Sequence, residues 1–238
     1  MNPLGFVVAR APADLVAVPA TLVSCQQIPM LSADLGAALG LDPERHRSAG
    51  LVTCDQDDAM YVALDQATKE ADVDVVFGKS FYAGSKHASG PYSGEIMGIV
   101  AGEHPDHVAE ALWAIGGLLQ HIHFHTFPGE NRPAFFAHVI SETGRYLAPQ
   151  AGIEPGRPMA YLIAPPIESV LGIDAALKAA NVRLAKLLPP PSETNFGGGY
   201  LIGELADLEA AALAFIEAIR GIVASPLAAY RRPERLRR

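Results

Sequence analysis

Two hydrophobic patterns alternate along this chain: short apolar runs typical of strands, and longer stripes with the spacing of amphipathic helices. In the first half they predict, in chain order, a strand at 20–28, a short helix at 32–40, a strand at 49–54, a helix at 65–72 and a strand at 73–77. After a Gly-rich loop, a strand at 94–98 and a long helix at 104–121 follow. The second half repeats that order, with strands at 133–140, 160–166, 182–187 and 199–203 and helices at 141–152, 174–181 and 206–221. Because strands and helices mix without strict β-α-β alternation, the pattern favours layered α+β structure.

Local signals mark the ends of several predicted helices. Ser32 and Ser141 stand before the two short helices, where an N-cap hydroxyl is expected. Asp72 and Asn181 stand where the two middle helices should stop, directly before β-branched strands. The two halves therefore share helix boundaries as well as element order.

The two halves also share sequence. Residues 64–75 (LDQATKEADVDV) and 173–184 (IDAALKAANVRL) align at an offset of 109, with five of twelve positions identical. The identities are Asp65/Asp174, Ala67/Ala176, Lys69/Lys178, Ala71/Ala180 and Val73/Val182. Chance similarity between Ala-rich segments is the alternative, but three further matches are collinear: GLDPER (40–45) with GIEPGR (152–157), AGLV (49–52) with AYLI (160–163), and GEIMG (94–98) with GYLIG (199–203). We therefore predict two tandem domains, residues 1–125 and 126–238.

Length, composition and charge are compatible with this division. A chain of 238 residues suits one large or two small domains, and 50% hydrophobic residues allow a sizeable core. The formal charge is −8, and because the last eight residues (RRPERLRR) carry +4, the rest carries about −12. Such an acidic body argues against a nucleic-acid partner.

Cysteine usage and the lengths of apolar runs bear on the compartment. Cys25 and Cys54 form no disulfide framework or zinc pattern, which favours a reducing cytosol. The N-terminus lacks a basic segment and Asp14 interrupts its apolar run, so no signal peptide is expected. No uninterrupted run of 18 apolar residues occurs, so no membrane-spanning helix is expected.

The common catalytic fingerprints are absent from the sequence. There is no GxSxG, HExxH, GxxxxGK[ST] or GxGxxG segment. A GGG run at 197–199 is predicted to lie in a loop before a strand, which is the wrong context for a phosphate cradle at a helix start.

A histidine cluster, HIHFH, is a candidate metal site. His121, His123 and His125 would share one face of a strand, a spacing able to hold zinc. The alternative is a partly exposed strand end after a helix, with His121 near the helix C-terminus where the dipole favours it. Neither an acid nor a cysteine ligand is adjacent.

An acidic turn is a second candidate site. It comprises residues 55–58 (DQDD), and its counterpart in the second half, 165–168 (PPIE), contributes Glu168. Carboxylates from the two repeats that converge across a junction would suit an amine or a hydrated cation. The alternative is capping of a helix N-terminus by Asp57 or Asp58.

Two long loops occupy the same place in the two repeats. They are KSFYAGSKHASGPYSG (79–94) and PPPSETNFGGG (189–199), both rich in small residues and both carrying aromatic side chains. Long loops in compact domains tend to be functional, and the alternative is that these are surface linkers.

Taken together, these motifs resemble bacterial microcompartment (BMC) shell proteins. DQATKEADVDVV and DAALKAANVRLA resemble the signature helix and strand of the BMC domain, and two such domains resemble the tandem, trimer-forming class. More narrowly, the chain is similar to the ethanolamine-utilisation EutL type with circularly permuted domains, through AMYVALDQATKEA, FYAG, AHVISETGRYL, PMAYLIAPP, GIDAALKAANV and PPPSETN. The likeness runs from about residue 40 to 225.

The resemblance implies both a fold and an assembly. Each BMC domain is a small antiparallel sheet with helices, and the homotrimer forms a pseudohexameric flat tile. Tiles pack edge to edge with other microcompartment shell proteins around an organelle in the cytoplasm. The resemblance implies a structural protein rather than an enzyme, with no cofactor, membrane or nucleic-acid partner. It also places the signature-helix lysines, Lys69 and Lys178, at the tile edge.

The resemblance further implies a gated pore and a small-molecule site. The loops 79–94 and 189–199 would surround a central pore for a metabolite or cofactor. The candidate pore residues are Lys79, Phe81, Tyr82, Lys86, His87, Asn195, Phe196 and Gly197. Proteins of the EutL type also bind ethanolamine between the two domains of a subunit, and the matching acids here are Asp57, Asp58 and Glu168.

The chain departs from the family pattern in the His cluster, in the loop after FYAG and in the Arg-rich tail. A different amino alcohol, or a microcompartment with different chemistry, therefore fits as well. Two other classes of function stay open: a soluble regulator that binds a small molecule at the acidic turn, and a metalloprotein centred on the His cluster.

Overall fold

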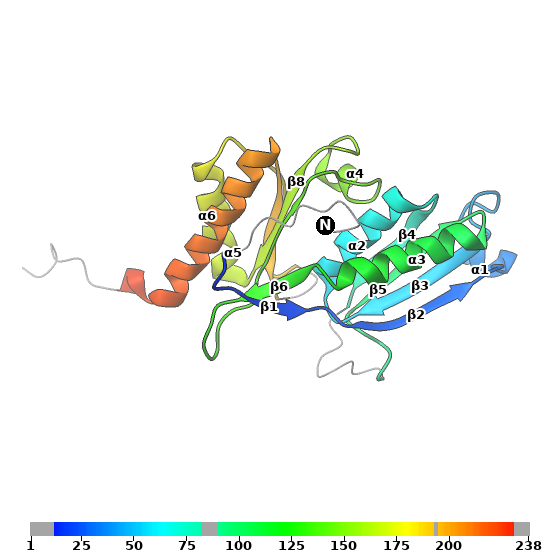
Figure 1. Cartoon of the computed structure of the whole chain (residues 1–238), viewed down its shortest axis with the longest axis horizontal. Coiled ribbons are helices and arrows are strands. Elements are labelled where there is room, and N and C mark those ends of the chain that lie inside the picture. Colours follow the sequence, from blue (N-terminus) through cyan, green and yellow to red (C-terminus); the bar gives the residue numbers. More distant parts are fainter. Residues whose placement is uncertain (1–11, 82–89, 193–194, 231–238) are drawn as a thin grey trace, which may run out of the picture.

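Two four-stranded antiparallel sheets with the same strand order dominate the part of the chain that the structure describes. The computed structural model describes residues 12–81, 90–192 and 195–230. The first sheet has the order β2-β3-β5-β4 and the second has the order β7-β8-β10-β9. A ribbon of β1 and β6 connects the two sheets at one end of each (Figure 1). The predicted α+β class is confirmed.

The first half follows the order predicted from the sequence. Its elements are β2 (Leu22–Ile28), α1 (Ala33–Ala38), β3 (Ser48–Cys54), α2 (Asp57–Glu70), β4 (Asp74–Ser80), β5 (Ile96–Gly102) and α3 (Pro105–Leu119). The Ser32 hydroxyl accepts a hydrogen bond from the Leu35 amide at 3.4 Å, which confirms the predicted N-cap of α1. Gly40, with φ of +69°, reverses the chain just after this helix.

The second half repeats these elements. They are β7 (Phe136–Ile140), α4 (Leu147–Ala151), β8 (Met159–Ala164), α5 (Pro166–Ala179), β9 (Arg183–Leu188), β10 (Gly197–Ile202) and α6 (Leu205–Ala224), followed by the 3-10 turn η1 (Ala228–Tyr230). Ser141 was expected to cap the short helix, and this prediction is wrong. The helix begins only at Leu147, because the segment before it turns back, and the Thr143 amide donates to the Arg157 carbonyl at 3.0 Å.

The connecting ribbon pairs β1 (Val16–Pro19) with β6 (His123–Thr126) in antiparallel register. The His-rich segment is thus a strand, as predicted, whereas β1 was not predicted. Gln56 holds both strands, because its side-chain nitrogen donates to the Val18 carbonyl at 2.8 Å and its oxygen accepts from the Phe124 amide at 3.4 Å. No helix in residues 12–81, 90–192 or 195–230 is long and apolar enough to cross a membrane.

The register of two sequence matches between the repeats differs from the structural register. Val52 and Leu162 each face the helices of their own half, although the sequence match aligned Val52 with Ile163. Val52 pairs with Gly98 and Leu162 pairs with Gly199, so Gly98 corresponds to Gly199 rather than to Gly203. The recurring Gly-apolar pattern of the strands allows several alignments, and only the pairing of neighbouring strands selects one.

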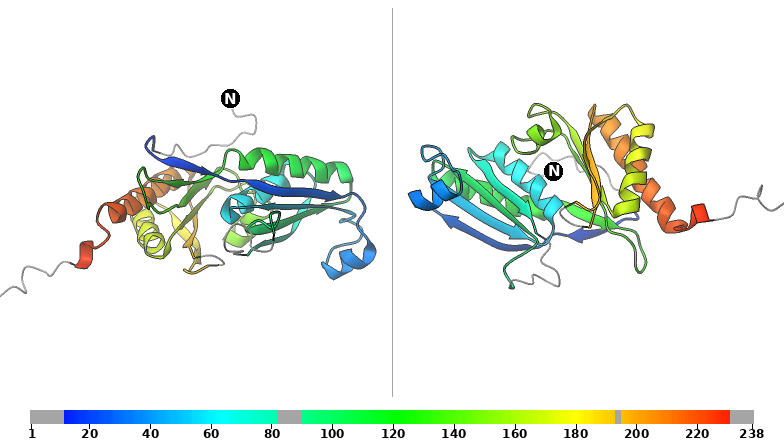
Figure 2. Two further views of the ribbon diagram at one scale, coloured as in Figure 1. Left: turned by 90° about the horizontal axis from the view of Figure 1, so that it is seen from below. Right: turned by 180° about the vertical axis from the view of Figure 1, so that it is seen from behind.

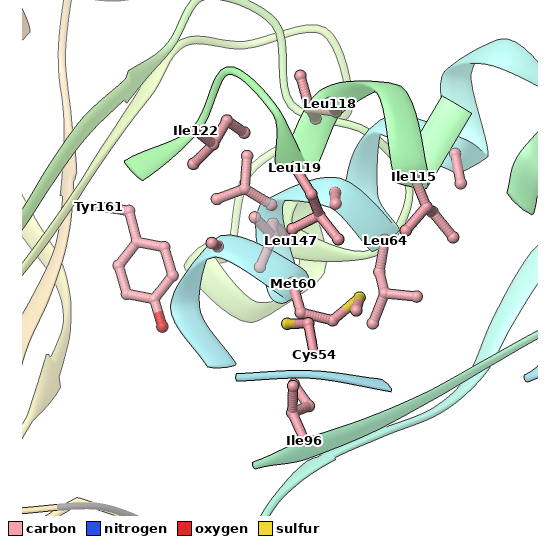
Figure 3. Packing of buried hydrophobic residues seen from close by; sticks show 14 of the residues in the cluster. Cys54, Met60, Leu64, Ile96, Ile115, Leu118, Leu119, Ile122, Leu147 and Tyr161 are labelled. Carbon is pink, nitrogen blue, oxygen red and sulfur yellow. The ribbon is translucent and has the colours of Figure 1, made fainter. Parts of the chain in front are cut away.

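The second sheet is buried on both faces. Alternate residues of β8 point to opposite sides: Leu162 packs with α5 and α6, whereas Tyr161 and Ile163 pack with α2 and α3 of the first half. Figure 2 shows α5 and α6 on the outer face of the second sheet and α2 on the opposite side. Figure 3 shows the core around Met60, Leu64 and Leu147, with Tyr161 entering it from the second sheet. One core therefore extends across the junction of the two halves.

Candidate functional site

The acidic turn forms the start of α2. Gln56 is the N-cap residue and makes no side-chain capping bond, so the alternative that Asp57 or Asp58 is the N-cap is wrong. Both acids instead lie in the first helical turn, where the helix dipole favours negative charge. Asp57 accepts from the Asp58 amide at 2.9 Å and from the Ser80 hydroxyl at 2.8 Å. These bonds fix one carboxylate between α2 and the end of β4.

Asp58 is buried against the second sheet, where its carboxylate accepts a hydrogen bond from the Tyr161 hydroxyl. Burial, and then the Asp58 charge, raise the pKa of Tyr161 well above its usual range, so this hydroxyl remains a donor. The Tyr161 and Tyr200 rings meet edge to face with centroids 4.7 Å apart. Burial also raises the pKa of Tyr200.

A cavity of about 390 Å³ opens beside this pair, and we call it the tyrosine cavity. Its lining residues are Asp57, Asp58, Tyr61, Gly78, Tyr146, Gln150, Tyr161, Ile163, Lys186, Leu188, Pro189, Pro191, Ser192 and Tyr200. Lys186 places its ammonium 5.6 Å from the Tyr200 ring centroid. The protein therefore supplies a cation of its own here, opposite the carboxylates and aromatic rings.

A second cavity of about 530 Å³ lies on the other side of Asp57, and we call it the acidic cavity. Its lining residues are Val18, Pro19, Asp55, Gln56, Asp57, Glu95, Phe124, Ala134, Asn195 and Phe196. Three of these side chains are carboxylates, and none of the described ones is a cation. The Phe124 and Phe196 rings, with centroids 6.0 Å apart, add an apolar wall. Such a lining suits a small cation with an apolar portion.

The bases of the two long loops meet at this acidic cavity. Glu95 directly follows the first loop, and its backbone carbonyl accepts from the Phe81 amide at 2.8 Å, while Asn195 and Phe196 belong to the second loop. Phe81 is 38% exposed, and Lys79 is an exposed residue of β4. Tyr82, Lys86 and His87 lie outside the described residues. The described pore candidates of the two loops thus lie near one another.

The glycine run before Tyr200 is part of a strand, not of a loop as predicted. Gly197, Gly198 and Gly199 pair with Ala164, Ile163 and Leu162 of β8. Gly198 has φ of +153°, and a Cβ atom there would overlap the Leu162 carbonyl oxygen. The absence of side chains therefore allows close strand contact, a requirement that sequence periodicity does not reveal.

Comparison with known proteins decides the family. The chain is 43% identical over 211 residues to the bacterial microcompartment shell protein EutL of Escherichia coli K12, covering 87% of this chain and 94% of the relative. It is also similar to the crystal structure of the ethanolamine utilization protein EutL from Leptotrichia buccalis, with a TM-score of 0.85, 45% identity and coverage of 89% of this chain and 98% of that one. The chain belongs to the EutL family of bacterial microcompartment shell proteins. No family model matches it.

Membership of the EutL family confirms several predictions. EutL from Clostridium perfringens has a TM-score of 0.86 at 39% identity, covering 90% of this chain and 98% of that one. The two repeats are therefore tandem BMC domains. As a EutL-family chain, the protein is a structural component of a microcompartment shell, which is a protein-bounded compartment of the cytoplasm, and it is not an enzyme.

Glu168 is not among the residues that line either cavity. It lies in the first turn of α5, on the outer side of the second sheet (Figure 1). Within one chain the structure thus brings Asp57 and Asp58 together but not Glu168. A ligand role for Glu168 stays a prediction for the assembled protein.

The His cluster does not form the zinc site that its spacing indicated. Among the described residues, no group of three or more His, Cys, Asp or Glu side chains could hold a metal ion. His121 lies in the turn before β6, and the His125 ring stacks on Phe135 with centroids 6.4 Å apart. Burial lowers the pKa of His123 and His125. Packing within the ribbon accounts for these side chains.

The two signature-helix lysines have different surroundings. Lys69 donates to the Glu142 carbonyl of the second half at 2.7 Å. Lys178 is 74% exposed in its side chain and pairs with Asp174 at 2.6 Å. Burial lowers the pKa of Lys69, although its positive charge is favoured by nearby Asp65. The two lysines therefore differ in burial, although they occupy the same position of the repeated motif. Their role at a tile edge stays a prediction.

Sequence reasoning missed most of the residues around the two cavities. Tyr61, Tyr161, Tyr200 and Lys186 come from four different elements and Tyr146 is the N-cap residue of a fifth, α4, so no local motif joins them. Phe124 was read only as part of the His-rich run. No spacing or periodicity in the sequence points to these tyrosines, because they lie far apart in the chain and do not occupy corresponding places in the two repeats.

Proposed function

We propose that this protein is a homotrimeric, pseudohexameric tile of a microcompartment shell, built from domains 1–125 and 126–238. The observation that carries the proposal is the repeated strand order of the two sheets, since three such chains present six similar units. The proposed boundary lies within β6, in the ribbon that links the sheets. The partners of the tile would be other shell proteins, with Lys69 and Lys178 near its edges.

Light scattering and negative-stain imaging test this proposal. Purified protein is expected to have the mass of a trimer and to form two-dimensional sheets. A monomer would contradict the proposal. A trimer that never forms sheets, alone or with other shell proteins, would favour the soluble regulator instead.

We further propose that the loops 79–94 and 189–199 line a gated central pore. Asn195 and Phe196 of the second loop line the acidic cavity together with Glu95, whose carbonyl accepts from the Phe81 amide of the first loop, and this supports a shared location for the two loop bases. The proposed pore residues among the described ones are Lys79, Phe81, Asn195, Phe196 and Gly197. Glycines provide the backbone freedom that two loop arrangements require. Passage through the pore would depend on its width, charge and hydrogen-bonding groups.

The acidic cavity is the proposed site for an amino alcohol such as ethanolamine. Asp57 would contact the ammonium, with Asp55 and Glu95 adding negative charge and Phe124 covering the carbon chain. The tyrosine cavity is a poorer choice, because the Lys186 ammonium already faces it. Asp58 would hold the start of α2 in place through Tyr161. Bound amine would shift the pore only if its affinity differs between the pore states.

Calorimetric titration with ethanolamine tests the site. Asp57→Asn is expected to weaken binding by about tenfold, equivalent to about 1.4 kcal/mol. Glu110→Gln, which removes an exposed carboxylate on α3, is the matched control and should bind as the wild type does. Equal affinity of the Asp57→Asn variant and the wild type would contradict the proposed site.

A further inference from the structure

A row of polar side chains runs across the four strands of the second sheet. His138 of β7 pairs with Tyr161 of β8, Tyr161 pairs with Tyr200 of β10, and Tyr200 pairs with Lys186 of β9. Residues that lie opposite each other on neighbouring strands share one face of a sheet. Tyr161 and Tyr200 pack in the core shared by the two halves, so this face looks toward the first half. We call these four residues the polar row.

The corresponding row of the first sheet is apolar where the polar row has its tyrosines and its lysine. Leu51 of β3 pairs with Ile99 of β5, and Ile99 pairs with Phe77 of β4. In the strand register described above, these three residues take the places of the two tyrosines and the lysine. A sheet of this kind therefore forms without polar groups at these positions. The polar row is a property of the second half alone.

Polar groups on a buried sheet face cost free energy unless they find partners. Tyr161 is 2% exposed, and its hydroxyl donates to the Asp58 carboxylate. The half-buried Lys186 differs, because its ammonium is in no ion pair with another residue that the structure describes. This ammonium lies 5.6 Å from the centroid of the Tyr200 ring. The row thus ends in a cation without a protein counterion among the described residues.

The Lys186 ammonium faces the tyrosine cavity, whose volume is about 390 Å³. The carboxylates in the lining of this cavity, Asp57 and Asp58, come from the other half of the chain, at the start of α2. Figure 3 shows Tyr161 reaching from the second sheet toward that helix. The cavity therefore receives positive charge from one half and negative charge from the other.

These charges restrict the class of ligand that the tyrosine cavity suits. A simple anion would be attracted by Lys186 but repelled by two carboxylates, and a simple cation would be repelled by the ammonium. A molecule that carries one group of each sign is matched at both ends. The rings of Tyr61 and Tyr146, with centroids 6.4 Å apart, also line the cavity and offer aromatic surface to an ammonium group.

We propose that the tyrosine cavity binds a small zwitterion of the amino-carboxylate class between the two halves of the chain. The carboxylate of this ligand pairs with the Lys186 ammonium, and its own ammonium lies toward Asp57 and the tyrosine rings. The site is separate from the proposed amino-alcohol site, because Lys186 is not among the described residues that line the acidic cavity. Asp57 lines both cavities. Binding of the zwitterion requires neither the pore nor the amino-alcohol site.

Calorimetric titration with three small probes tests the charge requirement. L-serine carries both charged groups, ethanolamine lacks the carboxylate, and acetate lacks the ammonium. Wild-type protein should bind L-serine more tightly than acetate. Lys186→Met, which keeps an unbranched apolar stem, should weaken L-serine binding by about tenfold or more and leave ethanolamine binding unchanged. Lys178→Met is the matched control, since the Lys178 side chain is 74% exposed on α5, and it should bind all three probes as the wild type does.

The outcomes separate this site from the proposed function. Equal affinity of the Lys186→Met variant and the wild type for L-serine would overturn the inference. A wild type that binds ethanolamine but not L-serine would also overturn it and leave the amino-alcohol site intact. A wild type that binds L-serine but not ethanolamine would support the zwitterion site and contradict the amino-alcohol site.

Nuclear magnetic resonance of isotope-labelled tyrosine rings locates the bound probe. L-serine should shift the ring signals of Tyr200, which the Tyr200→Phe variant identifies. The signals of Tyr230, whose side chain is 87% exposed near the C-terminus, should not move. Unchanged Tyr200 signals in a protein that binds L-serine would place the probe elsewhere and overturn the inference.

Discussion

The Tyr161 hydroxyl of β8 donates a hydrogen bond to the buried Asp58 carboxylate of α2, and this bond joins the two halves of the chain. It lies between the tyrosine cavity and the shared core, so it fixes the start of α2 against the second sheet. The position of Asp57, the preceding residue, depends on that attachment. The geometry of the acidic cavity is therefore linked to packing between the halves.

Tyr161→Phe should destabilise the protein, because it removes a donor from a buried carboxylate. The expected loss is about 1–3 kcal/mol in the free energy of unfolding. Urea denaturation at fixed protein concentration measures it. Tyr230→Phe, at a side chain that is 87% exposed, is the control and should change stability by less than about 0.5 kcal/mol. Equal stability of the two variants would contradict the role of this bond.

Asp65→Ala should weaken the contact between α2 and residues 144–147 more strongly, because the buried Asp65 carboxylate accepts hydrogen bonds from the amides of Gly144, Tyr146 and Leu147. The variant leaves three amides of the segment 144–147 without their acceptor, and the expected loss is roughly 3–5 kcal/mol. Hydrogen exchange should also show faster exchange at those amides. Asp72→Ala, at an exposed position after the same helix, serves as the reference variant. Unchanged exchange at Leu147 would show that the carboxylate does not hold this segment.

Stability should fall at acidic pH because of His138 on β7. Burial, and then the nearby Lys69 charge and His125, lower the pKa of His138 from 6.5 to about 4. The folded protein binds fewer protons at this site than the unfolded chain between these pH values. Its contribution of about 3 kcal/mol is therefore full above pH 6.5 and is lost as the pH falls toward 4.

Urea denaturation of His138→Gln and the wild type, at pH 7 and at pH 4.5, measures this contribution. The variant should lose less stability on acidification than the wild type does. His121→Gln, at an exposed ring, should keep the wild-type pH dependence. A parallel pH dependence of all three proteins would assign the acid sensitivity to other groups.

Gly198→Ala should prevent normal pairing of β10 with β8. A Cβ atom would meet the Leu162 carbonyl oxygen, and the φ of +153° is unfavourable for any other residue. We expect a loss of about 3 kcal/mol or more, or no folded protein at all. Gly221→Ala on α6, where nothing lies within 4 Å of the new methyl group, should instead be neutral or stabilise by up to about 1 kcal/mol. Thermal denaturation of both variants distinguishes these outcomes.

The two repeats can be recognised from the amino-acid sequence alone. Local periodicity locates all six α-helices that the structure describes, and the capping hydroxyl of Ser32 marks one helix start correctly. These features depend on residues within a few positions of each other. For the same reason the sequence indicates the acidic turn, since Asp57 and Asp58 are adjacent.

Tertiary packing decided what each copy of the motif does. Asp65 and Asp174 are the same residue in the same motif, yet only Asp65 is covered, because the second half folds over α2 and nothing in the described chain folds over α5. Tertiary packing also decides the role of the segment that begins at Ser141. This segment packs on α2, and Ser141 does not cap α4. Local sequence determines which element forms, because helix and strand patterns are short-range. Burial and hydrogen-bond partners depend on surfaces that come together from distant parts of the chain, and these determined the two cavities, the strand register and the uncovered face of α5.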